Sequence, residues 1–219
     1  MKTTATVDAL LMIIALGAAL WIANAAALPG AGTWAVAAGI AVGAWRLRRA
    51  GLGFADVGLR GSPAPAWRTA LGALGLVAIV MLAVGLLVTP LGHALGWPAQ
   101  DLSRFAWMRG DPAAFAAYLL LGWVGAACGE ELLFRGMLMN RLVAAFGVAR
   151  GPLVVVLQAA LFGAGHAYLG LRGVATATVV GLVLGTAWLR NGGRLAPLVL
   201  GHAVIDTISL TAIYAGAVP

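Results

Sequence analysis

The stretch FAAYLLLGWVGAACGEELLFRGML, residues 115–138, places two adjacent acids directly after an apolar run. Residues 115–128 carry no charge, Glu130 and Glu131 follow, and Arg135 lies four positions after the second acid. A membrane-spanning helix needs about 20 apolar residues, and a charged side chain at its centre costs about 2.5–3.5 kcal/mol. The stretch therefore predicts a membrane-spanning helix whose charged residues have a function.

The composition of the whole chain also indicates a membrane protein. Apolar residues make up 62% of the 219 residues and charged residues 10%, whereas a soluble domain carries about 25% charged residues. The mean hydropathy is +0.98. We expect an all-α, polytopic transmembrane helical bundle of about seven spans, within a range of six to eight, around an intramembrane polar cavity. We treat residues 1–219 as a single integral membrane domain, with N-terminal spans in 1–110 and a catalytic core in 111–219.

Apolar runs separated by Gly, Pro and Arg give the expected spans. The fourth helix continues to about residue 146, and Pro112 suits its first turn. The first run ends near ANA (23–25), which looks like a signal-peptide cleavage site, but its length favours a retained span over removal of residues 1–28. A Gly/Pro-rich loop is expected at 50–66. The runs are 9–28, 33–45, 68–89, 112–133, 152–169, 173–189 and 196–215.

The charge distribution predicts the orientation and the partners. The net charge is +7, from 14 Lys and Arg against seven Asp and Glu. The basic residues lie mostly in short connections and not in a stripe interleaved with aromatic residues, so we expect contact with the lipid bilayer and no nucleic acid. With a cytoplasmic N-terminus and an external C-terminus, only Arg104, Arg109 and Arg172 face outward, as the positive-inside rule requires. The Ala, Gly and Arg bias is typical of a GC-rich bacterial genome and favours a bacterial inner membrane.

Six charged or histidine residues fall inside the expected spans, on three separate segments. On the first segment, Glu131 and Arg135 have i,i+4 spacing and can pair. Glu130 points about 100° away, so this carboxylate is available as a general base. A salt bridge at the helix end, with Glu130 solvated, is the alternative interpretation. The six are Glu130, Glu131, Arg135, His166, His202 and Asp206.

The second and third segments each carry a histidine at helical spacing. Gln158, Phe162 and His166 are spaced i, i+4, i+8 and are expected to share one helix face. His202 and Asp206 are i,i+4, so Asp206 could orient the imidazole or bind with it. Taken alone, either histidine could equally be a hydrogen-bonded core residue.

The three segments together predict a reactive site. One carboxylate and two imidazoles from different helices can activate a water molecule and stabilise the oxyanion that forms when water attacks an amide. No cofactor is firmly expected, but Glu130, His166 and His202 could hold a divalent metal such as zinc. The chain has no HExxH motif for a zincin site and no GxSG for a rhomboid-like serine. Its single cysteine, Cys128, excludes an intrachain disulfide.

The motifs EExxxR, FxxxH and HxxxD, in this order on successive spans, resemble those of the CPBP family of intramembrane proteases. This family comprises the CAAX proteases and bacteriocin-processing enzymes, relatives of the eukaryotic Ras-converting endopeptidase. The resemblance covers roughly residues 110 to 215. It rests on Glu130, Glu131, Arg135, Phe162, His166, His202 and Asp206.

The resemblance implies a helical bundle with a cavity open to the cytosolic side and a water-activating pair, Glu130 and His166. His202 and the residue four positions later would stabilise the oxyanion, while Glu131, Arg135 and Phe162 would support the site. A membrane-anchored protein or a C-terminal peptide is the implied kind of substrate.

One position departs from the family pattern. The residue four after His202 is commonly Asn in the family and is Asp206 here. An ionised Asp cannot donate a hydrogen bond and repels an oxyanion. Asp206 is therefore protonated, or accepts from His202 and makes that ring a better donor, or ligates a metal.

Two non-proteolytic functions remain as alternatives. A membrane scaffold or immunity protein could bind a partner through the same polar cluster without cleaving it. A transporter or proton relay could use the intramembrane acids, although the chain has no internal repeat of the kind common in transporters. Replacing the acids by amides would leave a scaffold functional and would inactivate a protease.

Overall fold

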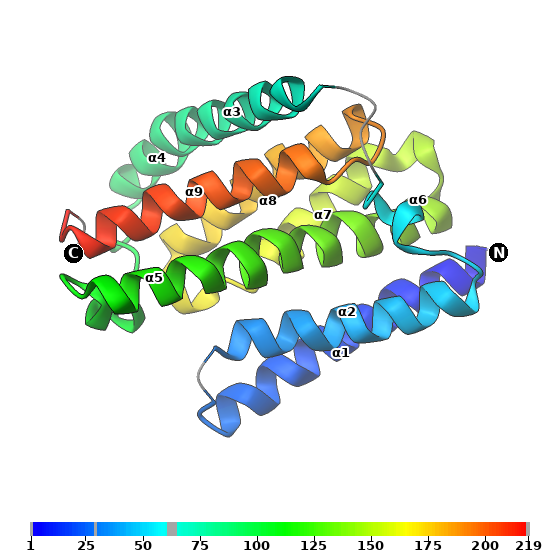
Figure 1. Cartoon of the computed structure of the whole chain (residues 1–219), viewed down its shortest axis with the longest axis horizontal. Helices are drawn as coiled ribbons and strands as arrows, with labels where there is room; N and C mark the ends of the chain where they lie inside the picture. Colours follow the sequence, from blue (N-terminus) through cyan, green and yellow to red (C-terminus); the bar gives the residue numbers. More distant parts are fainter. Residues whose placement is uncertain (1, 29, 61–64, 218–219) are drawn as a thin grey trace.

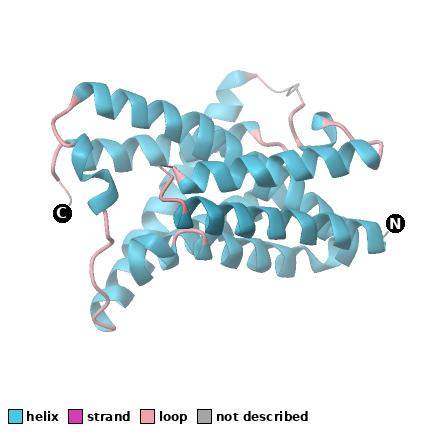
Figure 2. Ribbon diagram, turned by 90° about the horizontal axis from the view of Figure 1, so that it is seen from below, coloured by secondary structure: helices cyan, strands magenta, loops and turns pink. Residues whose placement is uncertain are grey.

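The computed structural model describes residues 2–28, 30–60 and 65–217, and this part of the chain is helical throughout, without strands (Figures 1 and 2). Part of the Gly/Pro-rich loop expected at 50–66 lies outside the described residues. The α-helices are α1 (Lys2–Ala25), α2 (Ala31–Arg49), α3 (Ala66–Ala83), α4 (Thr89–Ala94), α5 (Pro112–Leu121), α6 (Asn140–Phe146), α7 (Gly151–Ala164), α8 (Gly170–Arg190) and α9 (Ala196–Tyr214).

Two of these helices continue into their neighbours through π-helical segments. α3 and α4 are joined by η2 (Val84–Val88) into one helix, Ala66–Ala94. α5 and α6 are joined by η4 (Gly122–Met139) into Pro112–Phe146, as the sequence predicted for the helix that carries the acids. Short 3₁₀ turns occupy the connections η1 (Phe54–Val57), η3 (Ser103–Met108), η5 (Val148–Arg150) and η6 (Ala167–Leu169).

The long helix Pro112–Phe146 lies at the centre of the bundle. Its η4 segment packs against α2 on one side and α9 on the other, and α3 covers the outer side of α9 (Figure 1). α1 packs on α2 and α6, and the pair α7–α8 closes the remaining side. The two termini lie at opposite ends of the bundle (Figure 1), as an odd number of passes requires.

The outer surface of the bundle is apolar. Ile14, Leu82 and Leu86 are 62%, 61% and 70% exposed, and a soluble protein rarely shows such contiguous apolar surface. Five helices are long and apolar enough to cross a membrane: Lys2–Ala25, Ala66–Ala94, Pro112–Phe146, Ala167–Arg190 and Ala196–Tyr214. These findings confirm the polytopic helical bundle. α2, whose last turn carries three arginines, and the short α7 occupy the remaining two expected places.

The helix expected over the fifth apolar run ends earlier in the structure than predicted. We expected a helix over 152–169, but α7 ends at Ala164, and a turn and the short η6 follow. Gly165 follows the last helical residue, and Gly170 has a φ of +76° that residues with a side chain rarely adopt. These glycines let the chain reverse early, before it enters α8.

Glycines set the closest helix contacts. A Cβ on Gly181 of α8 would lie 2.8 Å from the Cα of Ala159 in α7, and one on Gly185 would lie 2.8 Å from Gln158 Nε2. A Cβ on Gly39 of α2 would likewise lie 2.8 Å from Leu133. Gly181 and Gly185 have the GxxxG spacing with which small residues let membrane helices pack closely.

We expect Gly181→Leu to destabilise the protein by at least about 1–3 kcal/mol, because the new side chain must push the α7 backbone away. Thermal unfolding in detergent measures the loss. Gly17→Leu is the matched control, since a Cβ at Gly17 has no neighbour within 4 Å. Equal unfolding temperatures for the two variants would contradict the contact.

Candidate active site

The central helix carries its acids near its middle, about 18 residues from its start and about 15 from its end. Asp111 caps its start by accepting hydrogen bonds from the backbone N–H groups of Ala113 and Ala114. The π-helical winding between Gly122 and Met139 includes Glu130, Glu131 and Arg135. Such winding is rare and is frequently found at functional sites.

Glu131 is the buried centre of the polar cluster. Arg135 Nη1 donates to Glu131 Oε1 at 2.6 Å, and His202 Nδ1 donates to the same oxygen at 2.9 Å. The side chains of Glu131 and Arg135 are fully buried. The predicted Glu131–Arg135 pair is present, but the bond to His202, 71 positions away in the chain, was not predicted.

The hydrogen bond from His202 Nδ1 determines what the other ring nitrogen can do. A carboxylate accepts only, so Nδ1 carries a proton and Nε2 points away from Glu131. Nε2 lies 4.0 Å from Glu130 Oε2 and 3.7 Å from Asp206 Oδ1. Nε2 can therefore accept a proton in the neutral ring, or donate a hydrogen bond once the ring is protonated.

Replacing Arg135 by Met is expected to cost about 3–5 kcal/mol of stability, because Glu131 would remain as a buried charge with one partner fewer. Thermal or denaturant unfolding in detergent measures this loss. The exposed Arg150, changed to Met, serves as the matched control and should shift stability by less than about 0.5 kcal/mol. Comparable losses in both variants would mean that burial of the pair does not set the cost.

The side chains of Glu130 and Asp206 are less buried than that of Glu131. Among the described residues, neither pairs with an Arg or Lys side chain. Their side chains are 18% and 23% exposed. Glu130 Oε2 and Asp206 Oδ2 have no hydrogen-bond partner among the described residues. Gly122 leaves room beside Asp206, since a Cβ there would lie 3.6 Å from Asp206 Oδ2. Two carboxylates thus flank His202 Nε2 with unpaired oxygens.

Phe162 joins the second motif to the rest of the cluster. Its ring is 4.6 Å from the Arg135 guanidinium carbon and 4.8 Å from the ring of His166. It also lies 6.2 Å from the ring of His202 and 5.2 Å from that of Phe134. Phe162 therefore packs between the two histidines and covers the buried Glu131–Arg135 pair with an aromatic face.

His166 lies just beyond the end of α7, not inside a helix as its i, i+4, i+8 spacing suggested. Its Nδ1 donates to the carbonyl oxygen of Phe162 at 2.8 Å. This bond satisfies one of the carbonyls that a helix end leaves without a partner. Since Nδ1 carries the proton, Nε2 of a neutral His166 is a free acceptor.

Tyr168 is a neighbour of the cluster that the sequence did not suggest. Its ring stacks on His166 at 6.1 Å, and the Arg104 guanidinium carbon lies over the Tyr168 ring, 5.1 Å from its centre. It also interacts electrostatically with Glu130 and Asp206. In the sequence, Tyr168 is marked only by its position two residues after His166. This spacing predicts no contact until the turn that follows α7 is known.

Asp8 is a second buried acid, and the sequence analysis did not predict its role. Arg46 Nε donates to Asp8 Oδ1 at 2.6 Å, and Arg141 Nη1 lies 3.7 Å from Asp8 Oδ2. These contacts tie α1 to α2 and α6, away from the histidines. Asp8 therefore belongs to the packing of the N-terminal hairpin and not to the candidate site.

The side chains predicted as possible metal ligands are not grouped for coordination. In the described part of the chain, no three or more His, Cys, Asp or Glu side chains are grouped so that they could hold a metal ion. Glu130, His166 and His202 therefore do not form a coordination sphere in this arrangement.

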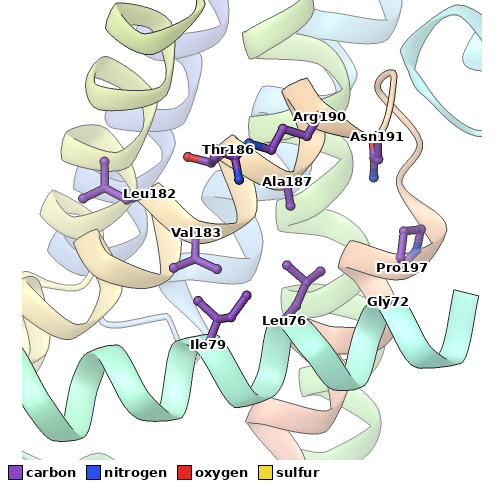
Figure 3. Close-up of a pocket in the computed structure, with 10 residues that line it drawn as sticks. All are labelled: Gly72, Leu76, Ile79, Leu182, Val183, Thr186, Ala187, Arg190, Asn191 and Pro197. Carbon is purple, nitrogen blue, oxygen red and sulfur yellow. The ribbon is translucent and has the colours of Figure 1, made fainter.

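A groove on the described surface lies apart from the polar cluster. It has a volume of about 520 Å³ and lies between α3 and α8 (Figure 3), with none of the motif residues on its walls. The predicted polar cavity beside Glu130 remains a prediction.

Comparison with known proteins supports the resemblance seen in the motifs. Residues 112–208 match the family model described as type II CAAX prenyl endopeptidase Rce1-like. The chain is also 32% identical, over 140 residues, to an uncharacterized 24.3 kDa protein of Escherichia coli. That match spans 63% of this chain and 61% of the E. coli protein. No solved structure was found to match.

The family match begins at the first residue of the central helix and ends two residues after Asp206, so it contains all three motifs. The family model of type II CAAX prenyl endopeptidases thus covers the part of the chain in which the motifs predicted a resemblance to the CPBP family.

Proposed function

We propose that the protein is an intramembrane endopeptidase that hydrolyses a peptide bond with water activated by Glu130. The main support is the arrangement around His202: Glu131 holds Nδ1, while Glu130 and Asp206 flank Nε2 with unpaired oxygens. Glu130 can thus act as a base, and His202 Nε2 as a hydrogen-bond donor, on an amide that reacts beside them. The family of endopeptidases matched by residues 112–208 supports the same reaction.

The reaction starts with the water. Glu130 takes a proton from a water molecule, whose oxygen forms a bond to the carbonyl carbon of the substrate. In the neutral His166 ring, whose Nδ1 donates to the carbonyl of Phe162, Nε2 accepts a hydrogen bond from that water and helps to hold it. The carbonyl π-electrons move to oxygen and give a tetrahedral oxyanion.

The oxyanion receives hydrogen bonds from the other side of the site. Protonated His202 donates from Nε2, and the negative charge of Glu131 stabilises this imidazolium. Asp206 contributes a second donor when it is protonated. As the C–N bond breaks, the protonated Glu130 gives its proton to the leaving amine and returns to a carboxylate. Water is consumed, and one acid and one amine are released.

The role of Asp206 can be tested by restoring the residue common in the family. We expect Asp206→Asn to keep kcat within about tenfold, because an amide donates from the same position without repelling the oxyanion. Asp206→Ala removes the donor and should lower kcat by about 10²–10³-fold. Steady-state kinetics on one peptide compare the variants. A large loss in Asp206→Asn would show that the carboxylate charge itself is required.

We also propose a class of substrate and an orientation of the protein in the membrane. The apolar surface supports a reaction within the bilayer, so a membrane-anchored protein or a C-terminal peptide held at the membrane is the proposed substrate. The excess of basic residues on the expected inner side supports a cytoplasmic N-terminus, an external C-terminus and a site that opens toward the cytoplasm of a bacterial inner membrane.

Cleavage of a quenched peptide library by the full chain in detergent tests the proposal, with Glu130→Gln as the blank. We expect the wild type to cleave and the blank not to cleave, both with and without a strong chelator. Loss of wild-type cleavage in chelator, restored by zinc, would replace the glutamate mechanism by a metal mechanism. Cleavage that persists in Glu130→Gln would overturn the proposed base.

A further inference from the structure

The groove between α3 and α8 lies on the membrane-facing side of two spanning helices. Gly72, Leu76 and Ile79 form its α3 wall at i, i+4, i+7, and Leu182 and Val183 lie on its α8 wall (Figure 3). Ile79 is 54% exposed. The volume of about 520 Å³ is within the range of ligand sites, about 300–1,000 Å³. The apolar walls and the volume of this groove therefore suit an apolar chain.

One end of the groove is cationic. Arg190, in the last turn of α8, lines the groove, and its side chain runs back along the helix toward Thr186 (Figure 3). Arg68 lies one helical turn before Gly72, on the same face of α3. No carboxylate of the described residues pairs with either guanidinium. The α8 wall thus ends in a positive charge without a carboxylate partner, and Arg68 of α3 lies one turn beyond the same end of the groove.

An exposed tryptophan lies beside these arginines. Trp67 is 58% exposed, and the Arg68 guanidinium lies 5.3 Å from its ring centre. Exposed tryptophans and terminal arginines are typical of the headgroup layer of a bilayer. The cationic end of the groove is therefore at the level of lipid phosphates, and the apolar part extends toward the hydrocarbon.

We propose that this groove binds an anionic phospholipid. One acyl chain lies along Leu76, Ile79 and Leu182, and the phosphate lies between Arg190 and Arg68. The occupant is a lipid because the site joins an apolar groove to a charged end at the membrane surface. It is anionic because the two cations have no protein counter-charge. This inference does not depend on the proposed proteolysis.

Native mass spectrometry of the full chain in detergent, titrated with lipid, tests the proposal. The probes are phosphatidylglycerol and phosphatidylcholine with identical acyl chains. Each arginine near the membrane surface attracts an anionic lipid by about 1 kcal/mol. We therefore expect phosphatidylglycerol to bind about 30-fold more tightly, and Arg68→Gln/Arg190→Gln to abolish this preference. Inorganic phosphate, which has no chain, should not compete.

Matched variants separate the groove from the general charge of the protein. Arg48→Gln/Arg150→Gln removes two exposed arginines that do not line the groove, and should keep the preference. Gly72→Leu fills the groove and should weaken both lipids, whereas Gly75→Leu, with no neighbour within 4 Å of its Cβ, should not.

Three results would overturn the proposal. Equal affinity of the wild type for the two lipids would mean that the groove takes neutral chains, such as the lipid chain of a substrate. A loss of preference in Arg48→Gln/Arg150→Gln equal to that in Arg68→Gln/Arg190→Gln would mean that only overall charge matters. Unchanged binding to Gly72→Leu would place the lipid elsewhere on the surface.

Discussion

Glu130→Gln is expected to lower kcat for peptide hydrolysis by about 10²–10⁴-fold, with KM little changed. The amide has nearly the same size as the carboxylate but cannot take a proton from water, and general-base catalysis contributes about this factor. An unchanged KM with a reduced kcat marks an interaction made in the transition state. Steady-state kinetics on the peptide identified by library cleavage give both constants.

Stability should change little in this variant, because Glu130 makes no hydrogen bond through Oε2 and keeps some exposure. Asp101→Asn is the matched control. Hydrogen bonds from Ser103 hold the pKa of Asp101 below its usual range, so this variant also replaces an ionised carboxylate by an amide, but outside the spans. Full activity in Glu130→Gln, at a normal unfolding temperature, would remove Glu130 from the mechanism.

Glu131→Gln is expected to lower kcat by about 10²–10⁴-fold, although Glu131 need not touch the substrate. Its Oε1 accepts from both Arg135 and His202 Nδ1, so it fixes the orientation of the imidazole and stabilises its protonated form. An amide at this position leaves two donors to share one neutral oxygen. Loss of an orienting carboxylate behind an active-site imidazole can cost about 10⁴-fold in kcat.

A purely structural role for Glu131 predicts a different outcome. Glu131→Asp keeps the charge and should recover part of the lost kcat, whereas Glu131→Gln should not, with KM similar in both. Thermal unfolding shows the temperature at which each variant is fully folded, and kinetics are compared below it. If the two variants lose kcat only in proportion to unfolded protein, Glu131 acts on stability alone.

Much of the central helix could be predicted from local sequence. Pro112 after Asp111 marks the helix start, and the apolar run followed by the acids carries the helix on to Phe146. The Glu131–Arg135 pair follows from i,i+4 spacing on one helix, which needs no knowledge of the rest of the fold. The three motifs also predicted the family correctly.

The end of α7 could not be predicted in the same way. An apolar run with helical spacing continues through His166, so the pattern favours one uninterrupted helix. Gly165 and Gly170 permit the turn, but they are two of 31 glycines in the chain, so neither marks the helix end in the sequence. The position of His166 at the helix end, and the stacking of Tyr168 on it, follow from that turn.

The sequence by itself determined that the chain is a helical membrane bundle, which residues carry charge inside it, and which family its motifs resemble. These properties are local, because they depend on hydropathy, on helical spacing and on short motifs. Only the tertiary structure decided that Glu131 binds His202, that Phe162 lies between the two histidines, and that Glu130 and Asp206 flank the same nitrogen. Each of these contacts joins different helices, and their geometry is set by how small residues such as Gly122 and Gly181 let those helices approach.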